Sequence, residues 1–117
     1  MPNVVGRRGE DLAAEHFLRL GYDVVARGFR TRFGEIDLIV CDGRTLVFVE
    51  VKARRAGSGH PWDALHEPKR RQVRRMAAAY LAVPDRVHAP ELRFDAVGVV
   101  VDGAGNLVSL DHLEGAF

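Results

Sequence analysis

The sequence contains little cysteine, little lysine and no long apolar run, and each scarcity excludes a class of protein. A single cysteine, Cys41, cannot form an internal disulfide and has no partner at metal-ligand spacing, so we interpret it as a small apolar residue at a strand end. No stretch approaches the roughly 20 apolar residues of a membrane span, and the first residues lack the apolar run of a secretory signal. We therefore expect a cytoplasmic protein without a membrane partner.

The length and the composition indicate one globular domain. A chain of 117 residues is large enough for one hydrophobic core and too short for two, so residues 1–117 are expected to form a single domain. Hydrophobic residues make up 47% of the chain and charged residues 28%, which is the balance of an ordinary globular protein.

The basic residues are unevenly distributed and are nearly all arginines. Only two of the 17 are lysines, Lys52 and Lys69, and lysine differs from arginine because it can lose its proton in a suitable environment. The net charge is +1, but residues 52–75 carry eight basic and two acidic side chains, whereas residues 76–117 carry two basic and six acidic ones. This asymmetry predicts a basic side that attracts polyanions and an acidic side.

The centre of the chain, residues 34–55, has the pattern of a β-hairpin. Side chains alternate with a period of two on either side of Asp42-Gly43, a strong signal for a two-residue turn. Such a turn pairs Cys41 with Arg44 and thereby sets the register of the whole hairpin. The pairs that this register predicts include Asp37 opposite Phe48 and Glu35 opposite Glu50.

The predicted register projects Asp37, Glu50 and Lys52 from one face of the hairpin. Carboxylates that share a face repel one another, so a positive group is expected among them. One interpretation is a solvated face on which Lys52 is a surface partner. The other is a hard divalent cation such as Mg²⁺, which binds through one or two carboxylates and keeps several waters. The apolar residues Leu46 and Phe48 on the same face favour the cation.

Residues 6–20 are predicted to form a short amphipathic helix that ends at Gly21. Glu10 lies three and seven positions before Ala13 and Phe17, which places it on the buried stripe of this helix. A carboxylate there also stabilises the positive end of the helix dipole. The pattern alone therefore leaves a dipole role and a functional role open for Glu10.

A second helix is predicted over residues 68–82, with Pro68 in its first turn. The side opposite its apolar stripe is either a solvated surface or a binding surface for a polyanion. The polyanion is favoured because like charges three and four residues apart destabilise an isolated helix. The arginines on this side are Arg70, Arg71, Arg74 and Arg75.

Three further strands complete the prediction. Residues 22–30 form the first, with a bulge expected at Gly28, and residues 92–101 and 106–110 form the last two. Trp62 is interpreted as a packing residue, with a base-stacking platform as the alternative, and Asp95 as a structural residue that pairs with Arg93 or a neighbour. The order helix, three strands, helix, two strands predicts an α/β three-layer sandwich in which helices flank a mixed central sheet.

Asp37 followed by Glu50-Val51-Lys52 on the next strand resembles the PD-(D/E)xK nuclease signature, with Ile36 in place of the proline. The segments GEIDLIV and LVFVEVKARR are similar to the YraN-like family of predicted endonucleases, and the similarity extends from Gly9-Glu10 to Arg93-Phe94-Asp95. This resemblance implies a restriction-endonuclease-like fold similar to that of archaeal Holliday-junction resolvases. It also implies hydrolysis of DNA phosphodiester bonds with Mg²⁺ or Mn²⁺, in branched or single-stranded substrates.

The resemblance assigns a role to each matching residue. Asp37, Glu50 and the carbonyl of Val51 would bind the metal ion, Lys52 would act on the attacking water, and Glu10 would join the metal site. A homodimer is expected by analogy with resolvases, and a catalytically silent nucleic-acid-binding module or assembly partner is the alternative function. The residues expected to bind nucleic acid are Arg54, Arg55, Lys69, Arg70, Arg71, Arg74, Arg75 and Gln72, the last as a match to a helical glutamine of the superfamily.

Overall fold

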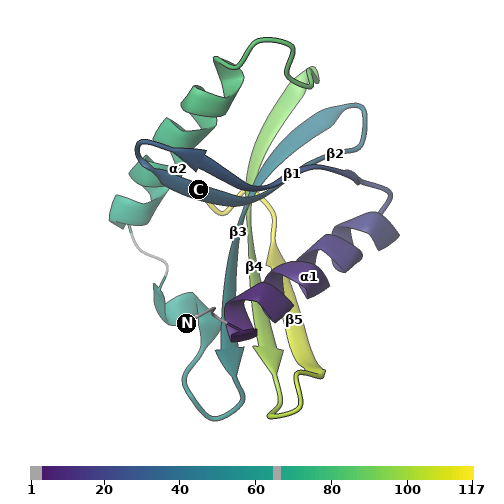
Figure 1. Ribbon diagram of the computed structural model, residues 1–117, viewed down its shortest axis with the longest axis vertical. Coiled ribbons are helices and arrows are strands. Elements are labelled where there is room, and N and C mark those ends of the chain that lie inside the picture. The colour runs from purple at the N-terminus through teal and green to yellow at the C-terminus, as the bar shows by residue number, and fades with distance from the viewer. Residues whose placement is uncertain (1–3, 65–66) are drawn as a thin grey trace.

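A five-stranded sheet in the order β1-β2-β3-β4-β5 lies between two α-helices (Figure 1). The computed structural model describes residues 4–64 and 67–117, without the side chains of residues 64–69. Its elements are α1 (Val4–Arg19), β1 (Asp23–Thr31), β2 (Gly34–Cys41), β3 (Thr45–Arg55), the 3₁₀ helix η1 (Pro61–Ala64), α2 (Glu67–Leu81), β4 (Glu91–Val101) and β5 (Leu107–Leu113). The predicted order and the α/β class are confirmed.

The sheet is mixed because one pair of neighbouring strands is parallel. β3 and β4 run parallel from Thr45↔Glu91 to Arg55↔Val101, whereas the other neighbouring pairs are antiparallel. Antiparallel neighbours need only short turns, but a parallel pair needs a crossover. Here η1 and α2 form that crossover, which places α2 on one face of the sheet.

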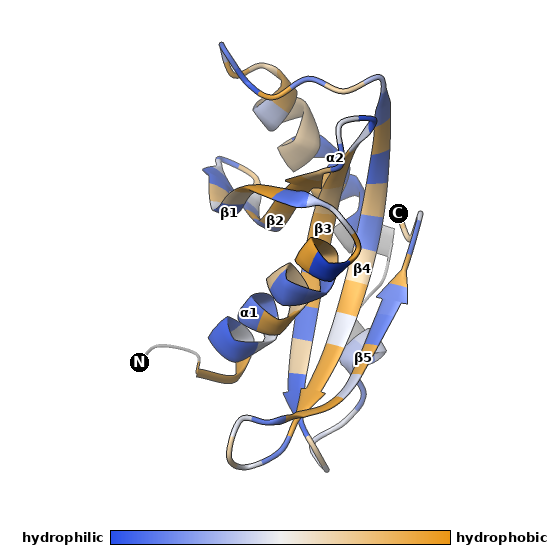
Figure 2. Cartoon of the chain, turned by 90° about the vertical axis from the view of Figure 1, so that its right-hand side faces the viewer, coloured by the Kyte–Doolittle hydropathy of each residue, from blue (hydrophilic) through white to orange (hydrophobic). Residues whose placement is uncertain are grey.

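Two hydrophobic cores, one on each face of the sheet, create the three layers. The α1 core contains Phe17 together with the residues of β3 and β4 that point toward α1. The α2 core contains Tyr80 and Met76 with Phe48 and Ile39 from the opposite face. β4 is apolar over much of its length (Figure 2) because its side chains are buried alternately in the two layers.

The register predicted for the β2–β3 hairpin is wrong by two residues. Cys41 pairs with Leu46 and not with Arg44, so the connection is a four-residue loop from Asp42 to Thr45. The cause is the Asp42 side chain, whose Oδ1 accepts the backbone N–H groups of Arg44 (2.9 Å) and Thr45 (2.8 Å). A shift of two residues preserves which face each side chain occupies.

The new register brings Asp37 directly across from Glu50. Leu38 pairs with Val49 at the end of the ladder, and the next position of each strand is Asp37 and Glu50. The predicted pairing of Asp37 with Phe48 is therefore corrected. Glu50 and Lys52 share a face, but the alternation of β2 is interrupted at Asp37, because Ile36 and Ile39 both join the α2 core while Leu38 joins the α1 core.

β1 differs from the prediction in the position of its irregularity. The register with β2 shifts between Val24 and Ala26, and pairing continues regularly through Gly28 to Thr31↔Gly34. Gly28 has a φ of 63°, and a β-carbon there would meet the end of the exposed Glu35 side chain, which can move aside. Glycine is therefore favoured at this position by its backbone conformation.

Two smaller predictions are confirmed. Trp62 packs over Gly98 of β4, where a β-carbon would lie 3.1 Å from the indole ring. Cys41 is a buried free cysteine at the end of β2. Among the helices of residues 4–64 and 67–117, none is long and apolar enough to cross a membrane.

Candidate functional site

The candidate site lies where β2 separates from β3. The β1–β2 hairpin extends sideways in Figure 1, while β3, β4 and β5 run vertically, so β2 follows β3 over only part of its length. At the separation, Asp37 Oδ2 accepts the backbone N–H of Val51 at 2.8 Å. The Asp37 carboxylate thus takes the place of a backbone acceptor on the neighbouring strand, and this hydrogen bond holds it beside β3.

The same geometry directs a backbone oxygen into the opening. In an extended strand, the N–H and C=O of one residue point toward the same edge. Because the Val51 N–H points toward Asp37, the Val51 carbonyl points toward the edge that β2 has left. The predicted contribution of this carbonyl is therefore compatible with the strand geometry.

Glu50 and Lys52 lie on the same strand and form a buried ion pair. Lys52 Nζ is 3.3 Å from Glu50 Oε1, and the side-chain exposures are 26% and 5%. Because Glu50 is almost fully buried, its charge is expensive without a cation nearby. Lys52 supplies one positive charge to a cluster that contains at least two carboxylates.

The electrostatics of Asp37 reflect the crowding of negative charge. Burial and the neighbouring charge of Glu50 raise the pKa of Asp37 from 3.8 to about 7, against the opposing effect of the Val51 hydrogen bond. The charge of Glu10 raises this pKa further, and that of Lys52 lowers it. A bound cation would favour the charged form of Asp37.

Within the described residues, Asp37 and Glu50 form no three-carboxylate ligand set with Glu10, which lies on α1 and acts on Asp37 through its charge. Burial raises the pKa of Glu10, Arg27 opposes the rise, and the charges of Glu35 and Glu50 add to it. The helix can approach β3 because Gly9 has no side chain: a β-carbon there would lie 2.5 Å from the Ala53 β-carbon. Glu10 and Glu35 also line an open hollow of about 440 Å³.

The donor set suits a small hard cation with few protein ligands. Carboxylate and carbonyl oxygens are the ligands of Mg²⁺ and Mn²⁺, and Mg²⁺ characteristically uses one or two carboxylates with several waters. Over residues 4–64 and 67–117, no three acidic, histidine or cysteine side chains converge as a ready ligand set. Asp37 and Glu50, with the Val51 carbonyl, therefore fit an ion that retains much of its water shell.

The predicted nucleic-acid contacts divide into three groups. Arg70, Arg71, Arg74 and Arg75 are all exposed on α2. Arg54 and Arg55 lie at the end of β3, beside Ser58, in a second hollow. The side chain of Lys69 lies outside the described residues.

Gln72 has a structural contact that the sequence did not reveal. Its Nε2 donates to the Phe33 carbonyl at 2.7 Å and thereby fastens the turn between β1 and β2 to α2. Arg74 likewise donates to the Phe117 carbonyl at 2.7 Å and lies over the Phe94 ring. These contacts hold the basic helix against the sheet.

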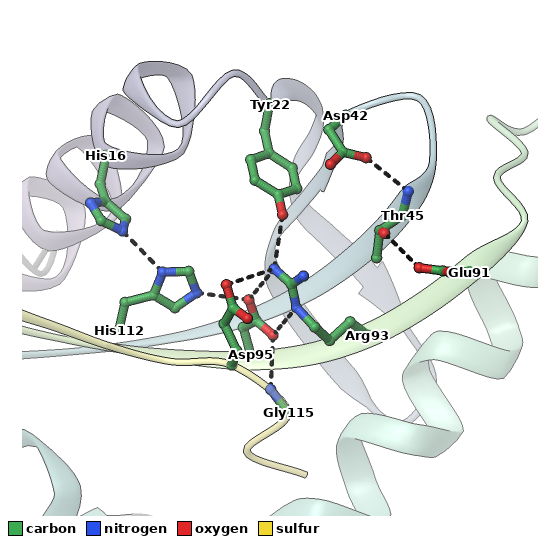
Figure 3. Close-up of polar contacts among 10 residues, drawn as sticks. His16, Tyr22, Asp42, Thr45, Glu91, Arg93, Asp95, His112 and Gly115 are labelled. Carbon is green, nitrogen blue, oxygen red and sulfur yellow. Dashed lines mark hydrogen bonds and ion pairs between the residues drawn. The ribbon is translucent and has the colours of Figure 1, made fainter.

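A second polar cluster lies under α1 (Figure 3) and involves Asp95, which has no exposed surface. Arg93 donates to both carboxylate oxygens at 2.8 and 2.9 Å, which confirms the predicted pair, and His112 Nε2 lies 2.7 Å from Oδ2. Burial would raise the pKa of Asp95, but the bonds from His112 and Arg93 outweigh it and keep the pKa below its usual value.

Residues far apart in the sequence complete the Asp95 cluster. His112 Nδ1 lies 3.0 Å from His16 Nε2 of α1, and Arg93 also donates to the Tyr22 hydroxyl at 3.0 Å. The sequence carried no signal for His112, because the last residues have no motif spacing. We interpret this network as a connection between α1, β4 and β5.

The fold and the candidate site together define a mixed α/β protein with a carboxylate–lysine cluster at the separation of two strands. Residues 9–99 match the uncharacterised protein family UPF0102, and the chain belongs to this family. A UPF0102 protein of Rhodococcus jostii is 41% identical over 97% of this chain and 95% of its own length. UPF0102 proteins of Geobacter sulfurreducens and Chlorobium phaeobacteroides are 41% and 36% identical, over 97% and 100% of this chain and 88% and 96% of their own lengths.

Proposed function

We propose that this protein is a metal-dependent nuclease of the restriction-endonuclease-like superfamily that hydrolyses phosphodiester bonds of DNA. The observation that carries the proposal is the cluster of Asp37, Glu50 and Lys52, fixed where β2 leaves β3. Two crowded carboxylates beside one lysine suit a site that receives a cation and a phosphate.

Each residue of the cluster has a distinct task in this proposal. Asp37, Glu50 and the Val51 carbonyl would hold Mg²⁺ or Mn²⁺, which when bound neutralises phosphate charge and lowers the pKa of a coordinated water. Lys52, held 3.3 Å from Glu50, would place its ammonium group beside the attacking water and the phosphate. Glu10 would contribute a further carboxylate from α1.

The arginines would position the substrate without reading its sequence. Arg71 and Arg75 on α2 and Arg54 and Arg55 at the end of β3 are within the segment of high positive charge. Arginine contacts to phosphate oxygens supply affinity that falls steeply with salt and little sequence information. The proposal therefore predicts a preference for the shape of DNA over its base sequence.

The test is cleavage of labelled duplex, single-stranded, flapped and four-way-junction DNA in Mg²⁺ or Mn²⁺. Glu50→Gln and Lys52→Met should each reduce the rate by about 100-fold or more, because groups that act on the proton or the metal contribute effects of this size. The matched control is Glu15→Gln, which removes an exposed carboxylate of α1 and should leave the rate unchanged.

Two outcomes would contradict the proposal. Cleavage that survives in both variants would mean that this cluster is not the active site. Salt-sensitive binding by the wild type without cutting of any substrate would instead support a nucleic-acid-binding module on the same fold. DNA binding measured by anisotropy in both variants separates loss of chemistry from loss of affinity.

A further inference from the structure

The turn between β1 and β2 carries an aromatic residue, Phe33, beside the basic helix. The turn is rigid because Thr31 Oγ1 donates to the Gly34 carbonyl at 2.9 Å and accepts the Phe33 N–H at 3.0 Å. It is also fastened to α2 by the bond from Gln72 to the Phe33 carbonyl. Gly34 has a φ of 132°, and a β-carbon there would lie 2.6 Å from Gln72 Nε2.

A pocket of about 270 Å³ opens between this turn and α2. We name it the Phe33 pocket; its lining residues are Phe33, Arg71, Gln72 and Arg75. Its volume is slightly below the range of pockets that enclose drug-sized ligands, roughly 300–1,000 Å³. The pocket therefore matches one small planar group better than a large ligand.

The walls of the Phe33 pocket combine an aromatic ring with guanidinium groups. Arg75, which lines the pocket, has its guanidinium 5.8 Å from the centre of the Phe33 ring, and Arg32, which lies outside the lining, has its own 4.9 Å from that centre. Arg71 adds an exposed positive charge at the rim. Unpaired nucleobases are bound by stacking on aromatic rings and guanidinium planes, while arginines bind the adjoining phosphates.

The Phe33 pocket lies on the same side of the sheet as the carboxylate cluster. Phe33 packs against the α2 core, and Glu50 and Lys52 continue the alternation of Leu46 and Phe48 toward α2. Phe33 precedes Asp37 by four residues of β2, a separation of roughly 13 Å along an extended strand. This distance corresponds to about four nucleotides at the 3.4 Å spacing of a stacked strand.

We propose that the Phe33 pocket binds an unpaired base of single-stranded nucleic acid, with the base against Phe33 and its phosphates on Arg71 and Arg75. The path of the strand onward to Asp37 rests on the proposed nuclease function, but the binding itself does not. A duplex cannot use the pocket in the same way, because its bases are paired and stacked within the helix. The protein thereby discriminates single-stranded from double-stranded substrate.

The experiment measures fluorescence anisotropy of labelled 16-nucleotide oligo(dT), oligo(rU) and a blunt 16-base-pair duplex, in EDTA so that no cleavage occurs. Phe33→Leu keeps apolar volume and removes the ring, and should weaken single-strand binding about tenfold without changing duplex binding. Phe33→Tyr keeps the ring and should bind like the wild type. Arg19→Gln, at an exposed position at the end of α1, is the charge control for Arg71→Gln.

Arg71→Gln should weaken binding of all three ligands and reduce the slope of log affinity against log salt by about one. A single 2-aminopurine placed along the oligo(dT) should be quenched by the wild type at one position and not by Phe33→Leu. Equal binding of oligo(dT) and oligo(rU) identifies the unpaired base as the shared feature, and a preference is assigned to the sugar or to the C5-methyl group of thymine by adding oligo(dU). Thermal denaturation verifies that each variant is folded.

The proposal is overturned if the wild type binds single strands no better than the duplex, or if Phe33→Leu affects the two equally. It is also overturned if Phe33→Tyr is as weak as Phe33→Leu, because then the ring is not the recognition element. Selective single-strand binding without cleavage in Mg²⁺ would refute the nuclease and leave the pocket intact. Cleavage in Mg²⁺ together with an equal effect of Phe33→Leu on single-strand and duplex binding would refute the pocket and leave the nuclease proposal intact.

Discussion

Replacing Asp37 by asparagine should stabilise the protein at pH 8, although it changes a predicted active-site residue. Asparagine has nearly the same shape, and its oxygen can still accept the Val51 N–H. The substitution removes one of the crowded negative charges beside the buried Glu50. A residue that destabilises the fold in its charged form is typical of a site selected for function.

The magnitude follows from the perturbed ionisation of Asp37. A rise of the pKa from 3.8 to about 7 corresponds to roughly 4 kcal/mol. We expect about half of this, roughly 2 kcal/mol, in the free energy of unfolding, because the side chain remains partly open to screening by water. The corresponding rise in melting temperature is about 8 °C for a domain of this size.

The sign of the pH dependence follows from proton linkage. Between about pH 4 and pH 7, the folded wild type binds a proton at Asp37 that the unfolded chain has lost. The free energy of unfolding of the wild type therefore falls as the pH rises through this window. That of Asp37→Asn does not fall for this reason, because asparagine does not ionise. The difference between the two proteins should be small at pH 4 and should reach its full value above about pH 7.

Urea denaturation in EDTA at pH 4, 6 and 8 measures this difference, with Glu15→Gln as the exposed control. Adding Mg²⁺ at pH 8 should stabilise the wild type and not Asp37→Asn, and the effect should weaken at pH 6 because metal ligands must be deprotonated. The reasoning fails if Asp37→Asn is destabilised at pH 8, or if its difference from the wild type is the same at every pH.

Two further predictions concern packing and the buried network. Gly9→Ala should destabilise the protein by about 1–3 kcal/mol, because the added methyl group overpacks against Ala53. Ala53→Gly in the same chain should restore most of the lost stability. If it does not, the contact with Ala53 is not the cause. Asp95→Asn should cost about 3 kcal/mol in urea denaturation, because the fully buried carboxylate pairs with Arg93, lies against His112 and accepts the Gly115 N–H, and a loss below about 1 kcal/mol would contradict this.

The register predicted for the hairpin was wrong, and the alternation predicted for β2 is interrupted at Asp37. A side-chain period of two is a local property, so the sequence determined that Glu50 and Lys52 share a face, whereas Ile36 and Ile39 both join the α2 core. The turn signal at Asp42-Gly43 was read as two residues, whereas the Asp42 side chain closes a four-residue loop. An error of two residues by itself leaves the face of each residue unchanged.

The sequence by itself determined the order of the elements, the two apolar faces and the pair of Glu50 and Lys52, and the resemblance to a known signature added Asp37 and Glu10 as a prediction. These follow from periodicity, from charge and from a resemblance to a known signature. Such signals act over a few residues, which is why they can be read along the chain.

Only the tertiary structure decided where β2 leaves β3, that Asp37 binds the Val51 N–H there, and how Phe33 meets α2. It also decided that His112, near the end of the chain, contacts Asp95 under α1. The physical reason is that these contacts join segments distant in the chain. Their formation depends on the packing of both layers against the sheet, and no local pattern encodes that packing.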